Sequence, residues 1–161
     1  MITFHVPPDR KLLAAFGELA LRHEHLNHIL RMTIKTLADL RPDEALGATA
    51  YDGSRQLRGR IRKLARQRLS EGAPLLKLQA LLERCRHATD RRNELMHWIW
   101  AKELDGEAMR LGPDHKSYPL PSLNDLKRLS SEIESLTTEL NVARLKGFLF
   151  EALAQGGKNC I

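Results

Sequence analysis

Along four stretches of the chain, apolar residues recur three and four positions apart, which is the spacing of one face of an α-helix. Prolines and glycines separate these stretches and mark where the helices begin and end. The polar segment between residues 41 and 53 predicts an irregular connection. The pattern predicts helices over about Asp9–Leu40, Ser54–Leu69, Pro74–Met96 and Ser122–Leu153.

The pattern changes after the third of these helices. Two short runs, Trp98–Ala101 and Ala108–Leu111, flank the dipeptide Asp105-Gly106, which favours the tight turn of a β-hairpin. The sequence therefore predicts a short β-hairpin here. A continuation of the third helix to Leu104 is the alternative.

The fourth predicted helix has recognisable ends. Ser122, with Asp125 three residues later, resembles a capping box in which Asp replaces the usual Glu. The dipeptide Gly156-Gly157 is a typical helix end. One apolar stripe runs between these ends, so we expect a single continuous helix.

The composition agrees with a helical fold. Apolar residues make up 42% of the 161 residues and aromatic residues only 5%, and Leu, Ala, Arg and Glu dominate, which favours helix packing. Cys85 and Cys160 form neither a disulfide framework nor a metal-ligand spacing. We expect an all-α fold, a bundle of four main helices with a short β-hairpin after the third, in a single domain over residues 1–161.

The charge of the chain points to a polyanionic partner. The net charge is +6 and the pI is near 9.6, which favours association with RNA or DNA but says nothing about the fold. The first residues lack the features of a signal peptide, and no apolar run approaches the roughly 18 residues that a membrane span needs. We expect a soluble, cytoplasmic protein with no membrane partner.

The segment from Arg92 to His97 concentrates the residues best suited to chemistry on a phosphate. His97 belongs to the one residue type whose ordinary pKa lies near neutrality, so it can both take and give a proton. Arg92 offers a fixed cation with a donor fork that matches phosphate oxygens, and Asn93 adds a polar amide one helical turn before His97. The alternative is a buried polar cluster or a helix-end cap, with His97 near the negative end of the helix dipole.

This motif resembles the signature of the HEPN superfamily, small helical-bundle proteins that include RNA-cleaving toxins and defence nucleases. The signature is an arginine, then four to six residues, then a histidine. Arg92 and His97 have four residues between them, and Asn93 is the kind of polar residue that commonly follows the arginine. The layout is similar too, because a long first helix, a motif near the end of the third and a long last helix together span most of the chain.

The resemblance implies a metal-independent endoribonuclease in which the ribose 2′-hydroxyl attacks the adjacent phosphate. It implies that His97 moves the proton, that Arg92 binds the phosphate and its added negative charge, and that Asn93 orients the imidazole or binds the RNA backbone. Arg92 and His97 are about 140° apart around an ideal helix, and the family joins two motifs across a dimer interface. The resemblance therefore implies a homodimer, an antitoxin protein as a further partner, and no cofactor. A non-catalytic HEPN-like interaction or nucleic-acid-binding module is the alternative.

Two further groups are candidates for nucleic-acid binding. The second predicted helix carries a basic run, of which Arg55, Arg58, Arg62 and Arg66 share one face that would track a phosphate backbone, and a solvated helix face is the alternative. Trp98 and Trp100 would stack on bases near the motif, or else fill the core or a dimer interface. Three more arginines would extend the basic field if the second and third helices lay side by side: Arg84, Arg86 and Arg91.

The histidines of the first helix are the last candidate. His23, His25 and His28 are close in sequence, but they lack the HExxH spacing that puts two imidazoles and a glutamate on one face. Glu94 and His97 match one ExxH element of a di-iron bundle, and no second copy appears in the chain. We therefore expect no metal site, and surface or interface histidines on the first helix.

Overall fold

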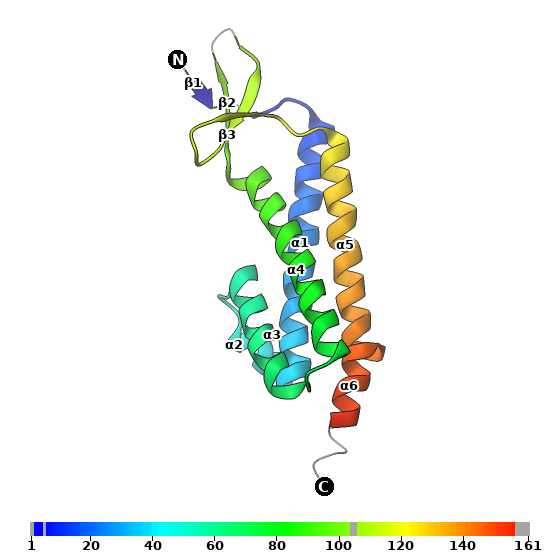
Figure 1. Ribbon diagram of the computed structural model, residues 1–161. Coiled ribbons are helices and arrows are strands. Elements are labelled where there is room, and N and C mark those ends of the chain that lie inside the picture. The colour runs from blue at the N-terminus through cyan, green and yellow to red at the C-terminus, as the bar shows by residue number, and fades with distance from the viewer. Residues whose placement is uncertain (1, 5, 104–105, 157–161) are drawn as a thin grey trace.

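The computed structural model describes residues 2–4, 6–103 and 106–156. Long helices form an elongated body, with a small sheet at one end and the last helix at the other (Figure 1). The elements are β1 (Ile2–Phe4), α1 (Arg10–Ala38), α2 (Pro42–Ala48), α3 (Ser54–Arg68), α4 (Ala73–His97), β2 (Ile99–Glu103), β3 (Ala108–Leu111), β4 (Ser117–Pro119), α5 (Leu123–Lys146) and α6 (Phe148–Gly156).

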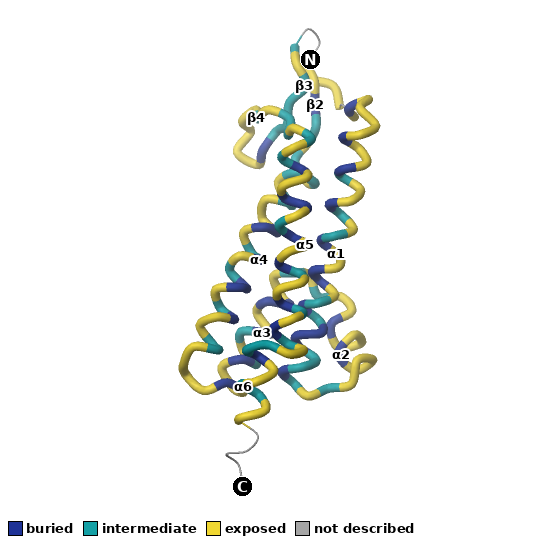
Figure 2. The backbone as a smooth tube through the Cα atoms, turned by 90° about the vertical axis from the view of Figure 1, so that its right-hand side faces the viewer, coloured by how far each residue is buried: buried dark blue, intermediate teal, exposed yellow. Residues whose placement is uncertain are grey.

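The two helices α1 and α5 form the main seam of the core. They run in the same direction, and α4 runs in the opposite direction beside them (Figure 1). Leucines such as Leu19, Leu26 and Leu136 are fully buried along this seam, and each stabilises the fold by roughly 2 kcal/mol. Buried positions recur along the inward sides of α1, α4 and α5 (Figure 2).

The predicted first and third helices are confirmed, with local causes for their ends. The Asp9 side chain caps α1 by accepting hydrogen bonds from the backbone N–H groups of Lys11 and Leu12. Helix α4 follows Gly72, whose φ of 154° is accessible mainly to glycine. It ends at His97, so the Arg92 to His97 motif occupies its last turns, as predicted.

The irregular connection predicted between residues 41 and 53 is wrong in part, because α2 lies within it. Helix α1 already ends at Ala38, with Asp39 in the left-handed region, and Pro42 suits the first position of a new helix, where its missing N–H needs no partner. The Glu44 side chain accepts a hydrogen bond from the backbone N–H of Arg41 at 2.9 Å, which stabilises this start.

The all-α class is wrong in one respect, because a small sheet closes one end of the helices. Strands β1 to β4 lie in sequence order, and each neighbouring pair is antiparallel. The predicted hairpin is confirmed as β2 and β3, and the alternative of a longer third helix is wrong, because Trp98 is extended and a strand follows. Sequence spacing did not reveal β1, whose partner β2 lies about a hundred residues away. Asp105 of the predicted turn, together with Leu104, Gly157 and Cys160, lies outside the described residues.

The single helix predicted from Ser122 to Leu153 is also wrong, because it breaks at Gly147. A Cβ atom at Gly147 would lie 3.1 Å from the Cα atom of Ala143, so any side chain would crowd the backbone where α6 turns away from α5. The predicted capping box at the start is confirmed. Ser122 Oγ accepts from the N–H of Asp125 at 3.1 Å, and the carboxylate of Asp125 accepts from the N–H of Ser122 at 3.0 Å.

The chain is thus mainly helical, and its predicted helices differ in length. Helices α1, α4 and α5 have 29, 25 and 24 residues, whereas α3 has 15 and flanks α1 and α4 along only part of their length (Figure 1). Over the residues described, no helix is both long and apolar enough to cross a bilayer.

Candidate functional site

The three motif residues contact one another at the end of α4. Arg92 Nη1 donates a hydrogen bond to Asn93 Oδ1 at 3.2 Å and lies 3.5 Å from His97 Nε2. On an ideal helix the two residues are about 140° apart. The Arg92 side chain therefore reaches round the helix to His97. His97 is exposed, whereas Arg92 and Asn93 are half-buried.

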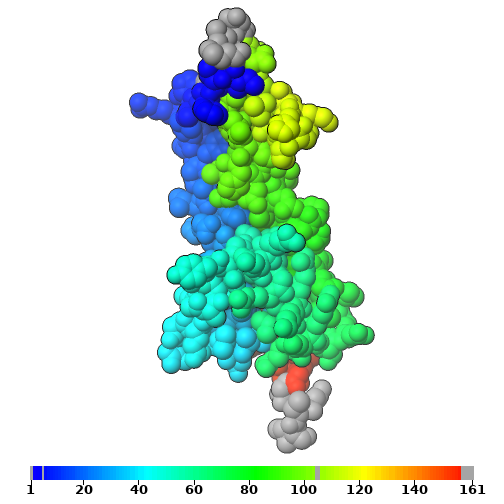
Figure 3. All heavy atoms as spheres, turned by 90° about the vertical axis from the view of Figure 1, so that its left-hand side faces the viewer, coloured from blue at the N-terminus to red at the C-terminus, as the bar shows by residue number. Residues whose placement is uncertain are grey.

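Arg92 and Asn93 also belong to a larger cleft between α1, α3 and α4. The cleft has a volume of about 730 Å³, which is within the usual range for a ligand site of roughly 300 to 1,000 Å³. Figure 3 shows this face, on which α3 (cyan to teal) lies against α1 (blue) and α4 (green). Five arginines and a single carboxylate line the cleft: Arg55, Arg58, Arg62, Arg86, Arg92 and Asp90.

Three of the four predicted α3 arginines line this cleft. Arg55 is exposed at the start of the helix, Arg62 is half-buried and Arg58 is buried. Arg66 is exposed and lies outside the cleft lining. The basic stripe is therefore not one solvated face, because its middle member points inward between the helices.

Helices α3 and α4 lie side by side, which is the condition for arginines of α4 to extend the basic field. The Arg58 Nη1 atom donates to Thr89 Oγ1 at 3.4 Å, and Arg62 lies 3.5 Å from Glu83. Arg86 extends the basic lining from α4, as the basic field required. Arg84 and Arg91 do not, because they point to α5, where Arg84 pairs with Glu139 and Arg91 with Glu132.

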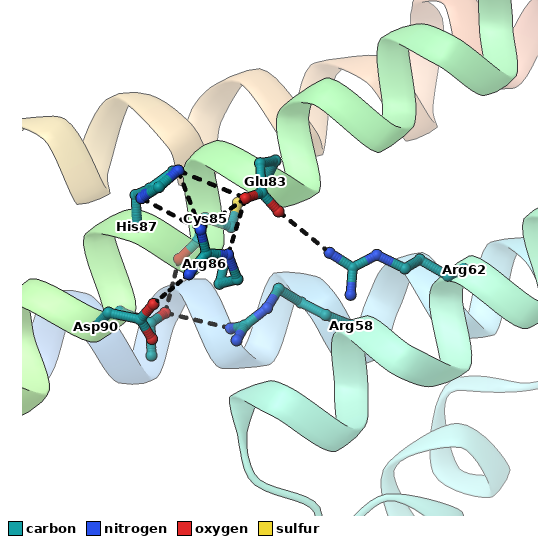
Figure 4. A network of polar contacts seen from close by, with 8 residues as sticks. Arg58, Arg62, Glu83, Cys85, Arg86, His87 and Asp90 are labelled. Atoms are coloured by element: carbon teal, nitrogen blue, oxygen red, sulfur yellow. Dashed lines mark hydrogen bonds and ion pairs between the residues drawn. The ribbon is translucent and has the colours of Figure 1, made fainter.

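Arg58 has an unusual environment for a buried cation. Only 4% of its surface is exposed, its Nε atom has no partner, and among the described residues no carboxylate pairs with it. The nearby carboxylates are already used, because Asp90 binds Arg86, and Glu83 contacts Arg86 and Arg62 (Figure 4). Burial lowers the pKa of Arg58, although a guanidinium stays protonated at neutral pH.

His23 is the buried imidazole of the cleft, with 3% of its surface exposed. Its Nε2 atom lies 3.4 Å from both Thr89 Oγ1 and Ser54 Oγ. Thr89 donates its single hydroxyl proton to the Cys85 carbonyl, and Ser54 donates its own to Asn27 Oδ1. Both hydroxyls are therefore acceptors toward His23, which favours the tautomer with the proton on Nε2.

The charge state of His23 follows from the same surroundings. Burial, and then the positive charge of Arg92, lower its pKa to about 4, so the imidazole is neutral at pH 7. Its Nδ1 atom has no hydrogen-bond partner and lies 3.9 Å from a carboxylate oxygen of Glu24. His25 and His28, by contrast, are exposed on α1, so the histidine cluster of the sequence is divided between the cleft and the surface.

The two tryptophans lie near the motif but outside the cleft lining. The Trp100 ring packs edge-on against Phe16, with 4.9 Å between centroids, and its Nε1 donates to the Leu95 carbonyl at 3.3 Å. Trp98 lies against Tyr118, and the Arg110 guanidinium is 5.3 Å from its ring centroid. Trp100 thus has the packing role that was the alternative to base stacking, and Trp98 lines a separate hollow with His97.

The sequence reasoning did not single out the polar residues on the inner faces of α1 and α4. Asn27, four residues after His23, is buried on the side of α1 that otherwise carries leucines, and Thr89 follows Cys85 by four residues on α4. Polar residues at core positions of an amphipathic helix were the available signal.

Searches against protein-family models, curated proteins and solved structures find no match to this chain.

Proposed function

We propose that this protein is a HEPN-like RNA-binding protein that cleaves RNA without a metal ion. One observation carries the proposal. The Arg92 guanidinium contacts both Asn93 and His97, and Arg92 also lines a cleft with four other arginines. A proton-transfer group, a phosphate-binding cation and a basic track are thus next to one another.

The cleft supports the binding half of the proposal. Its arginines outnumber its single carboxylate, and Arg55, Arg58 and Arg92 have no ion-pair partner among the described residues. A phosphodiester backbone supplies negative charge and acceptor oxygens at a regular spacing, and its counterions are released when such a surface binds it. The binding affinity should therefore decrease steeply as the salt concentration rises.

The motif supports the catalytic half. In the proposed reaction, His97 accepts the proton of the ribose 2′-hydroxyl as O2′ forms a bond to phosphorus. The bond from phosphorus to O5′ breaks, and the products are a 2′,3′-cyclic phosphate end and a 5′-hydroxyl end. Arg92 is suited to stabilise the negative charge that grows on the phosphate oxygens. Asn93 positions the Arg92 guanidinium by accepting its hydrogen bond.

A second proton carrier is needed for the leaving O5′ atom. We propose that it is His97 of a second copy, so that the active form is a homodimer in which two motifs share one site. The HEPN resemblance is the basis for this step, and it also makes a cytoplasmic toxin or defence role, with an antitoxin protein as partner, part of the proposal. The exposure of His97 supports the catalytic role, because it leaves the imidazole accessible to an RNA backbone. The alternative is a non-catalytic interaction or nucleic-acid-binding module.

The test is cleavage of labelled single-stranded and structured RNAs by the purified protein in EDTA. Arg92→Ala and His97→Ala should each lower the cleavage rate by about 100-fold or more. His25→Ala and Arg128→Ala are matched controls, because both residues are exposed and lie outside the cleft, and they should cleave like the wild type. Equal cleavage by all five proteins would point to a contaminating nuclease, and folded but inactive wild type would favour the non-catalytic module.

A further inference from the structure

Arg58 is buried but, among the described residues, it has no carboxylate as an ion-pair partner. Buried cations in proteins are paired with an anion, since an uncompensated charge loses its hydration without any return. Arg58 is 4% exposed, and within the part of the chain that the structure describes its one side-chain hydrogen bond goes to a neutral hydroxyl, that of Thr89, at 3.4 Å. The carboxylates around it, Glu83 and Asp90, bind other arginines (Figure 4). Burial lowers the pKa of Arg58 by more than the negative charge of Asp90 raises it.

The neighbouring polar groups offer Arg58 little further acceptor capacity. The Thr89 hydroxyl gives its proton to a backbone carbonyl and lies within reach of both Arg58 and His23, and the Ser54 hydroxyl gives its proton to Asn27. The side chains that complete this part of the cleft include Arg55 and Arg92, which only donate hydrogen bonds. The site therefore has an excess of positive charge and of hydrogen-bond donors, which negative charge and acceptor oxygens would balance.

The first turn of α3 adds to this excess. Its N-cap is Gly53, which has no side-chain oxygen to accept from the N–H groups of the first turn of this 15-residue helix. Gln56 Oε1 accepts only from the N–H of Gly53 itself, at 2.7 Å. Gly53, Ser54 and Arg55 all line the cleft, which directs the positive end of the helix dipole toward it. The buried and unpartnered Nε atom of Arg58, one turn further along the same helix, is an independent sign of a missing ligand.

We propose that this part of the cleft is a binding site for one phosphate group, held by Arg58 together with Arg55, Arg92 and the first turn of α3. Phosphate matches the site because it carries the missing charge and presents several acceptor oxygens to guanidinium donors. The group is carried by free phosphate, by a nucleotide or by RNA. The site does not depend on RNA cleavage, since none of its groups needs to move a proton.

The experiment measures binding of inorganic phosphate, adenosine monophosphate and a 2′-O-methyl RNA octamer, which resists cleavage by 2′-hydroxyl attack. Isothermal titration and the rise in Tm, in chloride buffers of matched ionic strength, are the two readouts. Arg58→Met should weaken phosphate binding by about tenfold or more, and Arg58→Lys should retain part of it. Arg128→Met on α5 is the matched control and should bind like the wild type.

The outcomes separate this site from the proposed nuclease. The probe with the tightest Arg58-dependent binding identifies the source of the phosphate group. Arg58-dependent binding in a wild type that cleaves no RNA would support the site and count against the nuclease. RNA cleavage with no loss of binding in a folded Arg58→Met variant would overturn the site and leave the nuclease standing. Absence of binding of all three probes to the folded wild type would also overturn the site.

Discussion

The two sides of α4 differ in how completely the arginines are paired with carboxylates, although Arg62 and Arg86 on the α3 side do have such partners. Toward α5, Arg84 pairs with Glu139 at 2.7 Å and Arg91 with Glu132 at 2.9 Å, both near the surface. Toward α3, Arg58 and Arg92 are more deeply placed and have no carboxylate partner among the described residues. Exposed arginines that are paired with carboxylates have their charge compensated within the fold. Inward arginines without such a partner indicate a surface that binds an anionic ligand.

The cores of the two sides differ in the same way. The α1–α5 seam is filled by leucines, whose side chains have no polar groups that require a hydrogen-bond partner. The α1–α3–α4 side buries His23, Asn27, Arg58 and Thr89, whose mutual hydrogen bonds are long or leave atoms unpartnered. We infer that the seam carries most of the stability and that the cleft trades stability for a binding surface.

The largest expected effect is in the seam. Leu136→Ala on α5 should lower the free energy of unfolding by about 3 kcal/mol, because the lost leucine is fully buried and leaves a cavity. Leu145→Ala on the same helix is the control, since half of that side chain is exposed, and it should cost about 0.5 kcal/mol or less. Urea unfolding measures both, and similar losses in the two variants would break the comparison.

The next effect is the pH dependence that His23 confers on the cleft side. The folded protein keeps His23 neutral down to about pH 4, whereas the unfolded chain takes up a proton near pH 6.5. The unfolded state thus binds more protons in this window, so stability is full above pH 6.5 and is lost as the pH falls toward 4. The loss attributable to His23 reaches about 3 kcal/mol only below pH 4, so it is smaller than this between pH 7 and pH 4.

His23→Gln isolates this contribution, because the other titratable groups remain. The difference in unfolding free energy between wild type and His23→Gln should shrink as the pH is lowered from 7 to 4. His25→Gln, at an exposed position, should follow the wild-type curve. A constant difference between wild type and His23→Gln would show that the imidazole of His23 is not kept neutral by burial.

The smallest effects compare the two kinds of arginine directly. Without phosphate, Arg58→Met should leave the free energy of unfolding unchanged or raise it by about 1 kcal/mol, because it removes an uncompensated buried charge. A double-mutant cycle of Arg84→Ala and Glu139→Ala should give a coupling of about 0.5 kcal/mol that weakens in high salt. Thermal unfolding at low and high chloride measures both. A loss above about 2 kcal/mol in Arg58→Met would mean that the fold itself uses that cation.

Much of the architecture was predictable because it depends on local signals. The spacing of apolar residues predicted α1, α3 and α4, and the Ser122 to Asp125 capping box predicted the start of α5. The break at Gly147 was missed, since the apolar stripe continues through it and the close approach to the Ala143 backbone is visible only in the folded chain. Strand β1 was missed because three residues have no periodicity to read and their partner is far away in sequence.

For the candidate site, too, some features were predictable from the sequence and others depend on tertiary contacts. The residue types and spacing of Arg92, Asn93 and His97 were visible in the sequence, as was the basic face of α3. The sequence did not show that Arg58 turns inward and Arg66 outward, nor that His23 joins Thr89 and Ser54 across three helices. Those contacts depend on how far α3 is rotated against α4, which no single helix pattern determines.

The sequence by itself determined where α1, α3 and α4 lie and where α5 begins, which faces are apolar, and that the chain carries an excess of arginine. Helical periodicity and charge are properties of neighbouring residues, so they can be read from one segment at a time. Only the tertiary structure decided which arginines find a carboxylate and which are left buried without one. Pairing and burial depend on residues from different helices meeting in space, and that meeting separates the paired arginines facing α5 from the unpaired ones in the cleft.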